Sequence, residues 1–156
     1  MQDSWAWSKN DCMLSTLPLN HYSGLVYTLL TPFHIGAQVD LMSKFNVELA
    51  WSKLLNEENP INVFIGVPTI FSQLIDYSLK NKLIRKDQVK EILKRKMRFI
   101  GSGSAPLNVK TYNDWFSLTN YKILERYGMT EIGMVLTNPY FETTSSQRIA
   151  GKLMIF

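Results

Sequence analysis

Residues 61–67, which read INVFIGV, constrain the fold more than any other stretch of the chain. Asn62 is their only polar residue, and the β-branched and aromatic side chains around it favour a strand. A continuous apolar run, rather than an alternating one, is typical of a strand covered on both faces of a parallel sheet. Pro68 follows at once and suits the first turn of a helix. Apolar residues then recur at helical spacing, at Ile70, Phe71, Leu74, Ile75 and Leu79.

The same alternation of strand and helix extends over most of the chain. The patterns predict helices over residues 22–35, 48–55, 86–96 and 108–118, and strands over residues 37–42, 97–100 and 122–125. The residues expected to face inward are Leu49, Trp51, Leu54 and Leu55 in one helix and Val109, Tyr112, Trp115 and Phe116 in another. Residues 1–16 show little periodicity and predict no element. We therefore expect an α/β fold with a mainly parallel sheet and flanking helices.

Composition and charge exclude several classes of protein. Hydrophobic residues make up 46% and charged residues 19% of the 156 residues, which excludes wholesale disorder. The net charge of +4 permits an anionic ligand, but the basic residues between 90 and 98 are interspersed with acid on a predicted helix, which indicates a solvated face and no nucleic-acid partner. The single cysteine, Cys12, excludes a disulfide within the chain. The sequence shows no apolar stretch long enough for a membrane span and no secretory signal, so we expect an intracellular protein.

A small-residue turn, GSGSAP at residues 101–106, follows one predicted strand. Glycine and other small residues let a flat ligand approach the backbone, and exposed amides there can hold a ring or a phosphate. A tight turn between a strand and a helix, with no ligand, is the alternative reading of the same residues.

A second turn, ERYGMTE at residues 125–131, follows the next predicted strand. Tyr127 can stack on a base, Thr130 can donate to a phosphate oxygen, and Glu131 can ligate Mg²⁺. A turn with solvated charges is the alternative. Because the carboxyl ends of neighbouring parallel strands meet at one edge of the sheet, we expect the two turns to share a site there.

Four motifs in order resemble the adenylate-forming acyl-CoA synthetase superfamily. They are LPLNH at 17–21, VPT at 67–69, GSGSAPL at 101–107 and YGMTE at 127–131. The resemblance runs from about Trp7 to Gly151, and the spacing of the last two motifs is highly specific. LERYGMTE at 124–131 together with SGSAPL is most similar to the malonyl-CoA and methylmalonyl-CoA synthetase branch, whose animal mitochondrial member is also matched weakly at residues 62–69.

The resemblance implies a ligase that uses ATP, Mg²⁺ and CoA. A small carboxylic acid attacks the α-phosphate of ATP to give an acyl-adenylate and pyrophosphate, and the CoA thiol then displaces AMP. The implied residues are Gly103, Ser104, Ala105, Tyr127, Gly128 and Thr130 for the nucleotide, His21, Thr130 and Glu131 for catalysis, Glu131 for the metal, and Ser102, Arg126 and Met129 for the acid.

Arg126 is the residue expected to set the class of acid. A guanidinium can replace the hydration of a second carboxylate, as on malonate, with two parallel hydrogen bonds. A fatty acyl tail would leave the same cation buried and unpaired, which is costly. The alternative is that Arg126 pairs with Glu125 or another acid of the surface.

Several parts of the family pattern do not appear among these residues. The phosphate loop is expected upstream of Trp7, and the lid domain with its lysine downstream of Gly151. Residues 1–156 are thus expected to be a central fragment of the large AMP-binding domain, without ligase turnover on its own. A non-catalytic product that binds a nucleotide or a partner, and a fragment of another acyl- or aryl-CoA ligase, remain open. A mitochondrial location rests on the resemblance alone.

Overall fold

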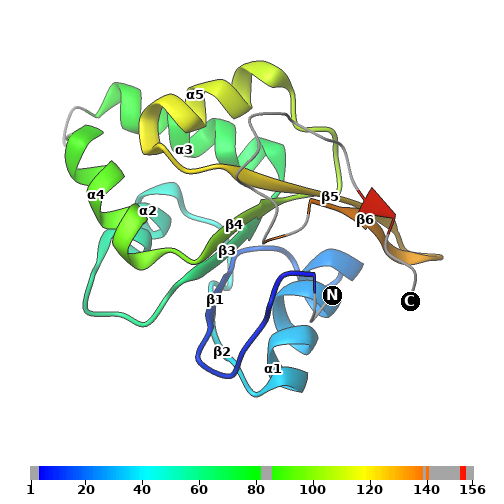
Figure 1. The fold of residues 1–156 in the computed structure, drawn as a ribbon. Helices are drawn as coiled ribbons and strands as arrows, with labels where there is room; N and C mark the ends of the chain where they lie inside the picture. Colours follow the sequence, from blue (N-terminus) through cyan, green and yellow to red (C-terminus); the bar gives the residue numbers. More distant parts are fainter. Residues whose placement is uncertain (1–3, 82–85, 139, 141–151, 154–156) are drawn as a thin grey trace.

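A computed structural model of the chain describes residues 4–81, 86–138, 140 and 152–153 (Figure 1). Its seven-stranded sheet has the order β2-β1-β3-β4-β5-β6-β7. The strands are β1 (Cys12–Ser15), β2 (Gln38–Leu41), β3 (Val63–Gly66), β4 (Phe99–Ser102), β5 (Ile123–Met129), β6 (Gly133–Thr137) and β7 (Lys152–Leu153). The helices are η1 (Ser23–Leu30), α1 (Thr31–Ile35), α2 (Val47–Leu55), α3 (Pro68–Lys80), α4 (Lys86–Lys96) and α5 (Val109–Thr119).

The first five strands of the sheet are parallel, and β6 and β7 are antiparallel to their neighbours. This confirms the expected α/β class with a mainly parallel sheet. β2 lies on one side of β1 and β3 on the other, so the direction of the chain across the sheet reverses at β1. In open parallel sheets such a reversal opens a crevice beyond the carboxyl ends of the strands, where ligands bind.

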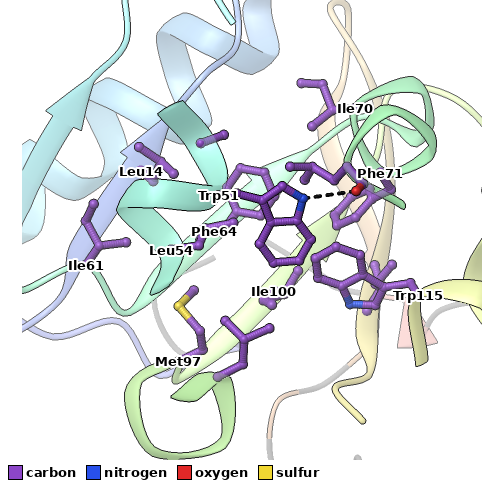
Figure 2. Close-up of a cluster of buried hydrophobic side chains, with 14 of the residues drawn as sticks. Leu14, Trp51, Leu54, Ile61, Phe64, Ile70, Phe71, Met97, Ile100 and Trp115 are labelled. Atoms are coloured by element: carbon purple, nitrogen blue, oxygen red, sulfur yellow. Dashed lines mark hydrogen bonds between the residues drawn. The ribbon is translucent and has the colours of Figure 1, made fainter. Parts of the chain in front are cut away.

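Two apolar layers cover the two faces of the sheet. Leu14, Phe64 and Ile100 belong to a buried cluster with residues of α2, α3, α4 and α5. Their strand neighbours Met13 and Phe99 belong to a second cluster, with Trp5 and residues of η1. Figure 2 shows the first layer, in which Trp51 stacks on Trp115 at 5.8 Å and donates a hydrogen bond to the Leu74 carbonyl at 3.0 Å. Strands covered on both faces explain the unbroken apolar run of β3.

The helix expected over residues 22–35 is present but wound in two ways. Its first part, η1, is a π-helix, and the Thr31 amide donates to the Val26 carbonyl five residues back. Pro32 has no amide proton, and its ring crowds the carbonyl four residues back, which disfavours an ordinary α-turn there. Gly36, at φ 81°, ends α1 in the left-handed conformation.

Some sequence predictions about this core were wrong. Leu49, Val109 and Phe116 were expected inside and are exposed, and so is Leu79, the last residue of the apolar pattern after Pro68. Val109 lies in the first turn of α5 and Leu79 in the last turn of α3. β1, which pairs with two strands at the sheet's reversal point, was not predicted at all.

The last predicted strand is longer than expected. The turn anticipated at Tyr127 is still strand, because β5 continues to Met129 and pairs with β6. Gly128 permits this pairing, since a Cβ atom there would lie 2.2 Å from the Gly133 carbonyl oxygen. Gly133, at φ 70°, takes a backbone conformation that glycine adopts freely as β6 begins. Among the helices described, none is long and apolar enough to cross a membrane.

Candidate functional site

The two predicted turns meet at the carboxyl edge of the sheet, as expected from their order. β4 and β5 are parallel neighbours, with Ser102 opposite Glu125. Between the turn after β4 and the outer half of β5 lies a cavity of about 310 Å³. We call it the small cavity; its lining is Ser104, Ala105, Pro106, Glu125, Arg126, Tyr127, Gly128 and Leu136.

Tyr127 is the aromatic wall of the small cavity. Its side chain is 52% exposed, so the ring is open to a flat ligand rather than packed into the core. Aromatic faces stack on bases at little cost in conformational entropy. The geometry therefore suits the base of a nucleotide.

The turn after β4 brings its backbone to the same cavity. Ser104 has φ 66°, which non-glycine residues rarely adopt. Its hydroxyl and that of Ser23 share a hydrogen bond of 2.6 Å, which ties the turn to η1. Backbone strain held by such contacts is common at ligand sites.

A second, larger cavity of about 820 Å³ adjoins the first. It is lined by the loops after β1, β2 and β3 and by the turn after β4, so it occupies the crevice at the reversal point of the sheet. His21 and Lys44 bring polar groups to its otherwise largely apolar wall. Ser104 lines both cavities, so the two are adjacent at that residue.

Arg126 is buried at the small cavity, with 7% of its surface exposed. Its Nε and Nη2 atoms have no hydrogen-bond partner in the described part of the chain. Its guanidinium carbon lies 4.2 Å from the ring centre of Tyr27, a cation–π contact. Burial lowers the pKa of Arg126 to about 10. The alternative of a pairing with an acid is not seen, since no carboxylate among the described residues forms an ion pair with this guanidinium.

The structure places the remaining predicted residues outside the small cavity. Gly103 lies against the Arg126 side chain, and Ser102 is buried with its hydroxyl unpartnered in the described chain. Met129, Thr130 and Glu131 are exposed where β5 ends and turns back into β6. Of the predicted residues, Ser104, Ala105, Arg126, Tyr127 and Gly128 are brought together, and His21 joins them through the larger cavity.

The described residues contain no group of three or more side chains that could hold a metal ion by themselves. Mg²⁺ that accompanies a nucleotide keeps waters and phosphate oxygens and needs only one or two carboxylates. The exposed carboxylate of Glu131 fits that lesser requirement.

Sequence reasoning missed two residues that shape this site. Tyr27 and Ser23 belong to η1, where the sequence pattern predicted only a helix. Tyr27 contacts Arg126 and Ser23 contacts Ser104, both of which lie far away in the sequence. The proximity of Tyr27 and Ser23 to the LPLNH motif was the one local signal that could have drawn attention to them.

Comparisons with known proteins agree with this geometry. A family model described as AMP-binding enzyme matches residues 1–155. The chain belongs to the AMP-binding enzyme family. Malonate–CoA ligase ACSF3, mitochondrial, of Mus musculus is 45% identical over 142 residues, which is 89% of this chain and 24% of that protein. The Homo sapiens protein of the same name is 40% identical over 152 residues, which is 96% of this chain and 26% of that one.

Solved structures with a similar fold support the same family. A malonyl-CoA ligase ternary product complex with methylmalonyl-CoA and AMP bound has a TM-score of 0.77 at 29% identity, covering 89% of this chain and 28% of that one. ATP-bound MatB from Rhodopseudomonas palustris has a TM-score of 0.76 at 29% identity, covering 97% and 27%. The resemblance seen in the sequence is confirmed. The chain spans about a quarter of the length of the curated relatives it matches.

Proposed function

We propose that this AMP-binding enzyme chain is the central part of the large domain of an acid–thiol ligase that activates malonate or methylmalonate with ATP and transfers it to CoA. The observation that carries the proposal is Arg126, a buried cation with unpartnered N–H groups beside the small cavity. Such a group is costly unless an anion completes it. The names of the mouse and human relatives, which are malonate–CoA ligases, support the same acid.

The residues of the small cavity divide between nucleotide and acid. Tyr127 takes the adenine on its open face, and the turn at Ser104 and Ala105 supplies backbone groups beside it. Arg126 takes the distal carboxylate of the acid, so that the other carboxylate is left free to react. The chain then contributes mainly positioning and charge stabilisation, which is what transfer to a phosphate requires.

The reaction proceeds in two steps. An oxygen of the free carboxylate bonds to the α-phosphorus of ATP while the bond to the pyrophosphate oxygen breaks. The thiol of CoA then loses its proton to solvent as its sulfur bonds to the acyl carbon, and AMP leaves with the bridging oxygen that came from the carboxylate. Bound Mg²⁺ offsets phosphate charge, and we assign Glu131 as its carboxylate ligand, with Thr130 as a donor to the α-phosphate.

The two adjacent cavities suit this order of events. An acyl-adenylate in the small cavity reaches Ser104, and at Ser104 the larger cavity begins. We propose that the thiol arm enters through the larger cavity, where His21 can donate a hydrogen bond at the boundary. The remaining groups of the ligase, a phosphate loop and a mobile lysine, belong to parts of the family pattern outside these 156 residues, so we expect binding without turnover. A mitochondrial location, printed for the mouse and human relatives, is proposed for this chain as well.

Calorimetric titration of the 156-residue chain tests the proposal. We expect saturable binding of AMP, and of malonate in the presence of AMP. Arg126→Gln should weaken malonate binding at least about tenfold, since a bidentate charged contact is lost, and leave AMP binding unchanged. Arg95→Gln, at an exposed arginine paired with Glu57, is the matched control and should change neither.

Equal loss of AMP and malonate binding in Arg126→Gln would count against the role of Arg126 in choosing the acid. Binding of neither ligand to the unaltered chain would refute the proposal for this chain. CoA thioester formation by the chain alone would contradict the expectation that it does not turn over.

A further inference from the structure

Arg98 and Arg126 are both shielded from solvent, but they differ in how their guanidinium N–H groups are hydrogen-bonded. Arg98 donates to both carboxylate oxygens of Asp11, at 2.7 and 3.0 Å, and to the Trp5 carbonyl at 2.6 Å. Its hydrogen-bonding capacity is used within the fold, which is the usual arrangement for an arginine that stabilises structure. Arg126 is more deeply buried and donates no hydrogen bond from Nε or Nη2 to any described residue.

Tyr27 is the group that faces the Arg126 guanidinium. The ring centre lies 4.2 Å from the guanidinium carbon, and Tyr27 itself is buried. A ring face attracts the cation through its quadrupole and accepts no conventional hydrogen bond from it. Tyr27 thus stabilises the charge and leaves the N–H groups unoccupied, which a carboxylate in the same position could not do.

The Tyr27 hydroxyl donates no hydrogen bond in this contact. Its oxygen is buried with no partner among the described residues, and burial raises its pKa. The contact seen in the structure is made by the face of the ring.

Residues on both sides of Tyr27 in the sequence anchor the helix η1 to the rest of the fold. Thr28, the next residue, shares a hydrogen bond of 2.7 Å with Ser15 at the end of β1. Ser23, one turn earlier, shares its bond with Ser104 beside the small cavity. The Arg126 side chain also passes over Gly103, where a Cβ would lie 2.6 Å from its Cγ atom. The guanidinium therefore contacts a fixed ring and a glycine, and neither one accepts its hydrogen bonds.

We infer that Tyr27 is a positioning residue for Arg126: its ring holds the guanidinium in place without using its N–H groups, which stay available to the second carboxylate of the acid. That the N–H groups of Arg126 bind the second carboxylate of the acid rests on the proposed function. That Tyr27 positions Arg126 does not depend on it. Tyr27 then sets the preference for a dicarboxylic acid by acting through Arg126 and has no contact with the nucleotide.

The test compares Tyr27→Phe, which keeps the ring and removes the unpartnered hydroxyl, with Tyr27→Leu, which removes the ring. The first readout is hydrogen exchange at Arg126 Nε–H, followed by NMR in the chain without ligand. We expect slow exchange in the unaltered chain and in Tyr27→Phe, and exchange on the order of tenfold faster in Tyr27→Leu. Equal exchange in all three proteins would overturn the inference.

The second readout is affinity for malonate and for AMP by calorimetry. Tyr27→Leu should weaken malonate binding by roughly tenfold and leave AMP binding unchanged, and Tyr27→Phe should retain both. A parallel loss of both ligands in Tyr27→Leu would show a merely structural role and overturn the inference.

The two proposals fail in different ways. If malonate does not bind the unaltered chain, the proposed function fails, and Nε–H exchange still decides whether Tyr27 holds Arg126. If Tyr27→Leu does not fold by near-ultraviolet circular dichroism, Tyr27→Met, whose flexible side chain fills a similar apolar space, takes its place with the same expected results.

Discussion

Gly103 offers the sharpest test of the packing around Arg126. A Cβ atom at this position would lie 2.6 Å from Cγ, 2.9 Å from Nε and 3.0 Å from Cζ of Arg126. All three distances are shorter than van der Waals contact, and the φ angle of Gly103 is not in the left-handed region. The effect of Gly103→Ala is therefore steric, and the side chain of Arg126 must leave its present position against Tyr27 and Gly103 to relieve it.

The expected magnitude follows from the buried position of Arg126. Overpacking a well-packed interior costs about 1–3 kcal/mol. With an ordinary denaturant slope, Gly103→Ala should lower the urea midpoint by roughly 1 M. Malonate binding should weaken as well, because the guanidinium is no longer held.

Gly101→Ala is the matched control, two residues earlier, within β4. A Cβ there would meet Ile65, Leu124 and Phe99 at 3.5–3.6 Å, which is ordinary contact. The change restricts the unfolded chain and should leave the free energy of unfolding equal or raise it by up to about 1 kcal/mol.

Urea unfolding of a double-mutant cycle identifies the clashing partner. In the Arg126→Ala background there is no Cγ to meet, so Gly103→Ala should cost almost nothing. If the loss of stability persists in that background, the clash is not with Arg126 and the reasoning is refuted.

Three further predictions concern single side chains. Arg126→Met should raise the free energy of unfolding by about 1 kcal/mol in urea, since an unpaired buried cation is replaced by an apolar group; a clear decrease would contradict this. Asp11→Ala should lower it by about 3 kcal/mol, because Arg98 loses a buried partner, whereas Asp114→Ala, at an exposed pair, should change it little. Burial raises the pKa of Tyr121, so the folded chain keeps a proton above pH 10 that the unfolded chain loses, and stability falls as pH rises past that value. Tyr121→Phe should remove this fall, so that its deficit relative to the unaltered chain is smaller at pH 11 than at pH 9.

The fold class was predictable because its signals are local. The apolar run of β3, Pro68 at the start of α3 and the charged faces of the helices each reveal one element without knowledge of its neighbours. β1 has no such signal. Its residues, CMLS, include a cysteine and a serine, and they form a strand because β2 and β3 pair with both of its edges.

The site was predictable in part for a similar reason. Ser104 and Ala105 follow β4, and Tyr127 lies in the outer half of its neighbour β5, so their order in the sequence places them at one edge of the sheet. The contact of Tyr27 with Arg126 joins segments far apart in the chain, and no periodicity reports it. The extension of β5 depends on the close approach of Gly128 and Gly133, which appears only once β6 is paired.

The hydrophobic layer beneath η1 also joins segments that leave the ribosome at different times during synthesis of the chain. Trp5 packs on Phe99 at 4.9 Å, and its indole donates a 2.8 Å hydrogen bond to Thr137, 132 residues further on. At synthesis rates of about 5–20 residues per second, the indole waits on the order of ten seconds for that partner to leave the ribosome. During this interval a large aromatic side chain has no complete burial site, so the emerging chain presents an early binding site for chaperones.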